Sequence, residues 1–125
     1  MSSQTAMPYL PALGITRPPA VIDAGLAGIL DEAAADADRL FADLSGPAPA
    51  AAPYALLNAH RRRVLVTMTL RELYHVSRLR EDSHSQWDIR DVAGQMSRVG
   101  REAFPLCARL LGGKDAMEAV LPQKL

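Results

Sequence analysis

The sequence contains a single cysteine, Cys107, among 125 residues. One thiol cannot form a disulfide within the chain, and it cannot supply the several thiolates of a structural zinc site. We therefore expect a reducing compartment. The spacing of His60, His75 and His84 resembles no known metal site, so we also expect no metal. No apolar run approaches the roughly 20 residues that span a bilayer, and the first residues include Ser, Gln and Pro where a signal peptide needs a basic start and an apolar run. These absences predict a cytoplasmic protein without a membrane partner.

Aromatic residues and net charge are scarce as well. Phe, Trp and Tyr make up 5% of the chain, and 14 Lys and Arg balance 14 Asp and Glu. Zero net charge gives no general attraction to nucleic acid. The basic run Arg61–Arg63 could contact nucleic acid, but a strand would send alternate side chains to opposite faces, and no aromatic residues interleave. We expect no nucleic-acid partner.

The chain is long enough for one small domain, because 49% of its residues are hydrophobic. Prolines at positions 8, 11, 18 and 19 predict an extended arm over residues 1–19. A single helical domain is expected at 20–111, followed by a tail at 112–125. Its core of small Ala, Leu and Val side chains buries little area per residue, so we expect the chain to self-associate or to bind a partner.

The spacing of apolar residues predicts three helices, at about 20–44, 69–80 and 85–103. β-Branched residues predict one short strand at about 61–68, so the fold class is mainly α with one short strand (α+β). No second strand-like run is evident, and the strand is expected to pair with another copy or another protein. The third helix is expected to turn these residues inward: Ile89, Val92, Ala93, Met96 and Val99.

The basic stretch at residues 69–90, TLRELYHVSRLREDSHSQWDIR, is the candidate for chemistry. Arg71 and His75 are four residues apart and share a helix face with Arg78 beside them, which gives a cationic surface suited to a phosphate or a ring carbonyl. Arg80 ends that helix. The alternative interpretation is a solvated charge run that neighbouring acidic side chains neutralise. Spacing alone does not separate the two.

The run LRELYHVSRLREDSHSQWDIRDVA resembles the C-terminal signature of the flavin-dependent thymidylate synthases, the ThyX family. That signature reads asparagine-x-arginine, a short helix ending in leucine-arginine, then alanine-glutamine-x-glutamate-isoleucine-arginine. The resemblance covers roughly residues 52–104 and implies the C-terminal helical part of that fold. It also implies the family's activity, in which dUMP receives a methylene from methylenetetrahydrofolate and a hydride from reduced FAD.

The resemblance implies roles for three side chains of the basic stretch. Arg80 falls on the catalytic, substrate-binding arginine that holds and polarises the uracil ring of dUMP, and Arg71 and His75 fall on positions that line the FAD site. A uracil ring that receives a carbon gains electron density on its carbonyl oxygens, and a fixed guanidinium stabilises that charge. The family uses no cysteine nucleophile, so Cys107 needs no role.

Two positions depart from the family signature. Pro53 stands where the family has an arginine that binds the nucleotide phosphate, and Thr69 replaces the signature asparagine. The arginine-histidine-arginine motif of the family's N-terminal half is absent, since HRRR at 60–63 has a different order. Two functions stay open. The chain is a shortened synthase completed by a second copy, as in a homo-oligomer, or by a complementing N-terminal-half protein; alternatively it is a non-catalytic, degenerate paralogue that acts as a binding or assembly module.

Overall fold

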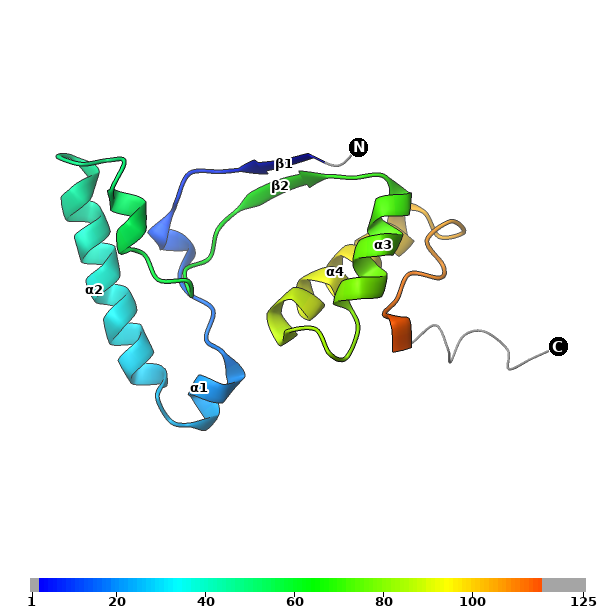
Figure 1. Cartoon of the computed structure of the whole chain (residues 1–125), viewed down its shortest axis with the longest axis horizontal. Helices are drawn as coiled ribbons and strands as arrows, with labels where there is room; N and C mark the ends of the chain where they lie inside the picture. The colour runs from blue at the N-terminus through cyan, green and yellow to red at the C-terminus, as the bar shows by residue number, and fades with distance from the viewer. Residues whose placement is uncertain (1–2, 116–125) are drawn as a thin grey trace. The chain divides into compact units, whose positions relative to one another are not determined.

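The structure is a computed structural model that describes residues 3–115. Along the chain, two strands, two short 3-10 helices and four α-helices follow in this order: β1 (Ser3–Ala6), η1 (Pro11–Leu13), α1 (Pro19–Asp23), α2 (Ala27–Ser45), η2 (Ala52–Ala55), β2 (Val64–Thr67), α3 (Leu70–Arg80) and α4 (Trp87–Ala103) (Figure 1). The mainly helical class, with a short strand inside residues 61–68, is confirmed. No helix in the described part of the chain is long and apolar enough to cross a membrane.

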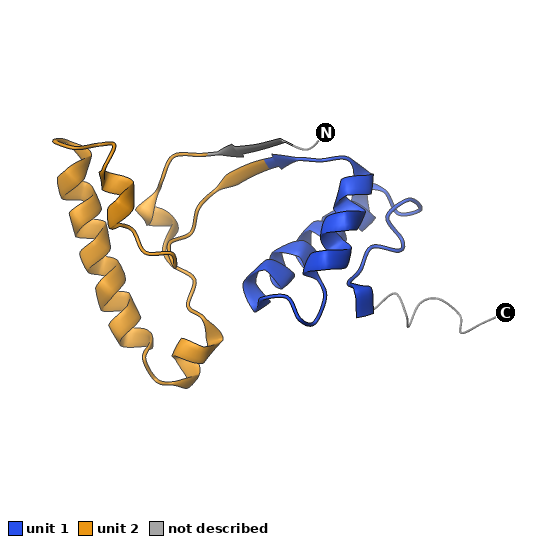
Figure 2. Ribbon diagram, in the orientation of Figure 1, with its two compact units in different colours: residues 1–4, 66–125 blue, residues 5–65 orange. Residues whose placement is uncertain are grey.

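The chain divides into two compact units (Figure 2). Thr5–Leu65 form one unit, and Met1–Gln4 together with Val66–Leu125 form the other. The division falls within β1 and β2, which pair in a two-stranded sheet. We expected the partner of the second strand to come from another chain, whereas the N-terminal arm of the same chain supplies it. The four residues of β1 precede the first proline of the arm, so each keeps the backbone N–H that pairing needs.

In the unit formed by Thr5–Leu65, the helix expected at 20–44 is two helices, α1 and α2. Gly25 separates them with a φ of +71°, a left-handed conformation that glycine adopts at little cost. Small side chains make the contact between α2 and η2, since Ala34, Ala37 and Ala52 are buried. Larger apolar side chains of the expected stripe remain exposed: Ile22, Leu26, Ile29 and Leu40.

The arginine run at 61–63 holds the N-terminal arm in this unit. The guanidinium of Arg62 lies 3.9 Å from the centre of the Tyr9 ring and donates a hydrogen bond of 2.9 Å to the Tyr9 hydroxyl. Arg61 donates from Nε to the hydroxyl of Thr16 at 3.1 Å. These contacts give two of the three arginines a structural role within the unit.

His60 in the same unit has a largely buried side chain, which is only 4% exposed. Its Nδ1 lies 3.0 Å from the backbone nitrogen and 3.2 Å from the carbonyl oxygen of Leu57, and its Nε2 lies 3.0 Å from the carboxylate of Asp38. Both ring nitrogens are therefore satisfied by the fold. The histidine joins the loop after η2 to α2.

In the other unit, α3 begins with a side-chain cap at Thr69. The Thr69 hydroxyl accepts the backbone N–H of Glu72 at 3.3 Å, and the Glu72 carboxylate accepts the backbone N–H of Thr69 at 2.8 Å. This reciprocal pair is a capping box, which satisfies donors that the first turn leaves free.

The face of α4 that meets α3 differs from the expected one. Small residues line it, namely Ala93, Ser97 and Gly100, which are all buried. Of the residues expected to point inward, Ala93 is buried and Met96 half-buried, but the prediction was wrong for three: Ile89, Val92 and Val99 are 38%, 44% and 59% exposed. Small side chains let the two helix backbones approach closely, and the larger apolar residues therefore lie beside the contact.

Candidate functional site

The three side chains of the predicted site, Arg71, His75 and Arg80, all lie on α3 and are exposed. Arg71 and His75 are four residues apart, so they lie on the same face of the helix. Arg80 follows His75 by five residues, which is about 140° further around the axis, and it is the last residue of the helix. The structure therefore brings Arg71 and His75 together and places Arg80 apart from them.

The described part of the chain provides no hydrogen bond or ion pair for the guanidinium of Arg80. The residue that follows it, Glu81, is by contrast firmly held. The hydroxyl of Ser77 donates to Glu81 Oε1 at 2.6 Å, and the hydroxyl of Ser97 in α4 donates to the same oxygen. Both serines are 0% exposed. The end of α3 is thus anchored to α4 directly beside Arg80.

The backbone at Glu81 is also held from the C-terminal side, by Gly113. A Cβ atom at position 113 would lie 2.7 Å from the carbonyl oxygen of Glu81 and 2.9 Å from the backbone nitrogen of Asp82. Only a residue without a side chain fits against this backbone.

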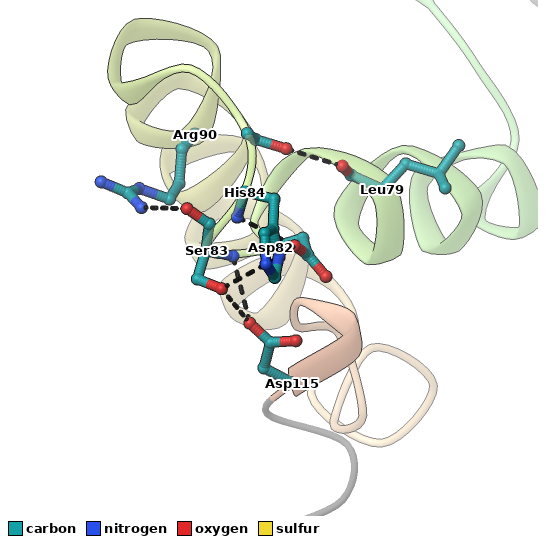
Figure 3. A network of polar contacts seen from close by, with 7 residues as sticks. Leu79, Asp82, Ser83, His84, Arg90 and Asp115 are labelled. Carbon is teal, nitrogen blue, oxygen red and sulfur yellow. Dashed lines mark hydrogen bonds and ion pairs between the residues drawn. The ribbon is translucent and has the colours of Figure 1, made fainter.

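A polar network fills the loop between α3 and α4 (Figure 3). Asp82 accepts hydrogen bonds from the backbone N–H of His84 at 3.0 Å and from its Nδ1 at 2.8 Å. These hydrogen bonds lower the pKa of the Asp82 carboxyl, and the backbone donor has the larger effect. Ser83 donates its backbone N–H to Asp115 at 3.2 Å, and its carbonyl accepts from Arg90 at 3.2 Å. The network joins the loop to α4 and to the C-terminal stretch.

Asp82, His84 and Asp115 are of a type that binds metals, and their ligand atoms lie within 4.8 Å of one another. Hydrogen bonds within the network account for this proximity, because Asp82 pairs with His84 and Asp115 with Ser83. The side chain of His84 is 90% exposed. We therefore assign these residues to the structure of the loop. Sequence spacing could not have grouped them, since Asp115 lies beyond α4.

A pocket of about 510 Å³ opens beside the anchored Glu81. Its walls come from Glu81 and from the polar face of α4, which contributes Trp87, Arg90, Asp91, Gly94, Gln95 and Arg98. A Cβ atom at Gly94 would meet nothing within 4 Å, so this residue forms an open floor. We did not identify Arg98 as a site residue from the sequence. The sequence pattern that could have identified Arg98 is its spacing from Arg90 and Gly94, because residues four apart lie on one face of a helix.

Comparison with known proteins gives the chain its relatives. A family model described as thymidylate synthase complementing protein matches residues 6–106. A flavin-dependent thymidylate synthase of Geobacter sulfurreducens is 38% identical over 81 residues, which are 65% of this chain and 34% of that protein. The one of Thermococcus onnurineus is 49% identical over 45 residues, 36% of this chain and 18% of that protein. The one of Sulfolobus acidocaldarius is 35% identical over 86 residues, 67% of this chain and 33% of that protein.

This chain therefore spans about a third or less of the length of these relatives. The family match includes all of α3 and α4, and with them the three residues singled out from the sequence.

Proposed function

The chain belongs to the thymidylate synthase complementing protein family, and on that premise we propose that it takes part in the methylation of dUMP to dTMP. In this proposal it is a shortened, flavin-dependent thymidylate synthase-like protein. It acts with FAD and methylenetetrahydrofolate, in the cytoplasm, when a second copy or a complementing N-terminal-half protein completes the site. The relatives are named as flavin-dependent thymidylate synthases, which supports the class of chemistry.

The observation that carries the proposal is the support under Arg80. The residue after it is anchored by two buried serines and packed against Gly113, while Arg80 itself is exposed. A charge-stabilising donor is effective when its surroundings fix it before the reaction begins. The backbone that carries Arg80 is fixed in this way, and its exposed guanidinium, which contacts no described acidic group, is available to hold the uracil ring and to stabilise charge on the ring carbonyls.

Arg71 and His75 are the residues of this chain that we assign to the flavin. Bound reduced FAD would supply the hydride of the reaction. The exposed pair on one face of α3 can contact an anionic or polar group of the cofactor. Two side chains on one helix cannot enclose a flavin, so we expect the isolated chain to bind FAD weakly and the completed complex to bind it firmly.

One observation favours the alternative, a non-catalytic paralogue that serves as a binding or assembly module. Pro53 lies in η2 at the position of the family's phosphate-binding arginine, and it offers no charge. Losing such a charged contact costs on the order of 1.5–3 kcal/mol, a factor of ten or more in dUMP affinity.

A chimaera tests the proposal. The matched region of this chain replaces the corresponding segment of the Geobacter sulfurreducens synthase, which supplies the remainder of that protein. We expect the chimaera to bind FAD, seen as flavin absorbance, and to bind dUMP weakly. Pro53→Arg should tighten dUMP binding about ten-fold or more. A colourless, folded chimaera that binds no dUMP even with Pro53→Arg would refute the proposal and favour the non-catalytic alternative.

A further inference from the structure

The pocket beside Glu81 is lined by two acidic and two basic side chains. Glu81 and Asp91 supply the carboxylates, and Arg90 and Arg98 supply the guanidinium groups. These charges sum to zero, so the pocket as a whole favours neither a simple anion nor a simple cation. What it can bind is decided by the groups whose bonding capacity the fold leaves unused.

Two of the four charged groups are engaged within the unit. Asp91 accepts a hydrogen bond of 2.7 Å from the side-chain amide of Gln95. Arg90 donates one of 3.2 Å to the carbonyl of Ser83 (Figure 3). Arg98 is exposed, and its guanidinium has no hydrogen bond or ion pair in the described part of the chain. Arg98 is therefore the free cation of the pocket.

Glu81 presents one carboxylate oxygen that is both fixed and free. The hydroxyls of Ser77 and Ser97 donate to Oε1. The other oxygen, Oε2, has no hydrogen-bond partner among the described residues, where no buried side-chain polar atom lacks one, so Oε2 is open to solvent. Because two buried serines hold the carboxylate, this acceptor is already in place before a ligand arrives.

Gly94 forms the floor between these two free groups. Arg98 follows it by four residues and lies on the same face of α4, and a helical side chain leans toward the N-terminus, over the turn that contains Gly94. Ser97, which holds Glu81, lies on the other side of Gly94 around the helix axis. The free carboxylate oxygen and the free guanidinium therefore flank a floor without a side chain, and no ion pair joins Glu81 to Arg98.

Trp87 adds an aromatic surface to the same pocket. It precedes Gly94 by seven residues, about two turns, and so lies on the same face of α4. Its side chain is half-buried and lines the pocket. An aromatic ring in this position offers contact area to an apolar or aromatic group of a ligand.

We propose that this pocket binds a zwitterionic α-amino acid with a large apolar side chain. The ammonium group donates to Oε2 of Glu81, the carboxylate accepts from Arg98, and the side chain lies against Trp87. Both polar contacts are charge-assisted hydrogen bonds, and a guanidinium matches the planar geometry of a carboxylate. The net charge of such a ligand is zero, as is that of the pocket, and a volume of about 510 Å³ has room for it.

Capped and uncapped forms of one amino acid test the proposal on the full chain. The inference goes beyond the proposed function and the assay needs neither flavin nor nucleotide, so the failure of one leaves the other standing. The probe is L-phenylalanine, and the readout is the emission of Trp87, the only tryptophan, with calorimetry as a second measurement. N-acetyl-L-phenylalanine lacks the ammonium group, and L-phenylalaninamide lacks the carboxylate. We expect saturable binding of L-phenylalanine and binding at least about ten-fold weaker for each capped form.

Three variants assign each charge to its partner. Arg98→Gln should weaken L-phenylalanine at least about ten-fold and abolish its advantage over the amide. Glu81→Gln keeps an oxygen for the two serines and should abolish the advantage over the N-acetyl form. Arg109→Gln is the matched control, because Arg109 is exposed and lies outside the pocket lining, and it should leave binding unchanged. Circular dichroism checks folding, and the exposed Arg98 provides a test even if Glu81→Gln does not fold.

Three results would overturn the proposal. The first is no binding of L-phenylalanine by fluorescence or calorimetry up to about 10 mM. The second is a capped form that binds as tightly as the free amino acid, which would indicate a simple anion or cation site. The third is an affinity for L-phenylalanine that Arg98→Gln leaves unchanged, or that Arg109→Gln lowers equally.

Discussion

Replacing Gly113 by alanine should destabilise the unit that carries Arg80. The added Cβ would lie 2.8 Å from the carbonyl carbon of Glu81 and 2.7 Å from its oxygen. The ordinary separation of non-bonded carbons is about 3.5 Å or more, so the backbone has to move by more than half an ångström. It cannot do so freely, because the Glu81 carboxylate is held by Ser77 and Ser97.

The magnitude follows from two opposing effects. Overpacking of this kind costs about 1–3 kcal/mol, and the rigid obstacle puts Gly113→Ala at about 2–3 kcal/mol. Loss of glycine's freedom in the unfolded chain returns about 0.4–1 kcal/mol. The net destabilisation is therefore about 1–2 kcal/mol, which lowers the melting temperature of a small domain by roughly 5–15 °C.

Urea unfolding followed by tryptophan fluorescence measures the change in unfolding free energy of this unit. Trp87 is the only tryptophan of the chain and lies at the start of α4, so it reports on this unit. Gly94→Ala is the matched control, because its Cβ meets nothing within 4 Å and alanine favours the helix by about 0.5–1 kcal/mol. The two variants should shift the midpoint in opposite directions. A Gly113→Ala protein as stable as the wild type would refute the packing described for Glu81.

Two further predictions concern the polar contacts. Ser97→Ala removes a buried donor to Glu81 and should cost about 1–3 kcal/mol in the same assay; a cost under about 0.5 kcal/mol would contradict the anchor. The pKa of Asp82 is lower in the folded state than in the unfolded chain. The ionised carboxylate therefore stabilises the fold at pH values above the ordinary pKa of an aspartate, and this contribution is lost as falling pH protonates the carboxylate in the folded protein. Asp82→Asn should therefore flatten the loss of stability from about pH 4 downward, and an unchanged acid limb would count against the network.

Features set by local sequence could be predicted. The β-branched run at 61–68 becomes β2, and Thr69 caps α3, because strand preference and capping depend on a few neighbouring residues. The helix predicted at about 69–80 likewise ends at Arg80. These local signals placed the basic stretch on the helix that carries it.

Long-range packing could not be predicted from the same signals. Apolar spacing in α4 indicated Val92 and Val99 as core, yet Ala93, Ser97 and Gly100 make the contact because α3 brings a serine and a carboxylate to that side. The network at the α3–α4 loop joins residues that are distant in the sequence. A short polar residue in an apolar pattern gives no sign of its partner until the fold is known.

The central claim is that Arg80 acts on the nucleotide while the equally charged Arg78 does not. The most direct test compares Arg80→Ala with Arg78→Ala in the chimaera that carries Pro53→Arg, with turnover of dUMP as the readout. The two residues lie about 160° apart around α3, and both are exposed. We predict a loss of roughly 10²-fold or more in turnover for Arg80→Ala and little change for Arg78→Ala. Equal effects of the two substitutions, or an active chimaera indifferent to Arg80→Ala, would contradict the account.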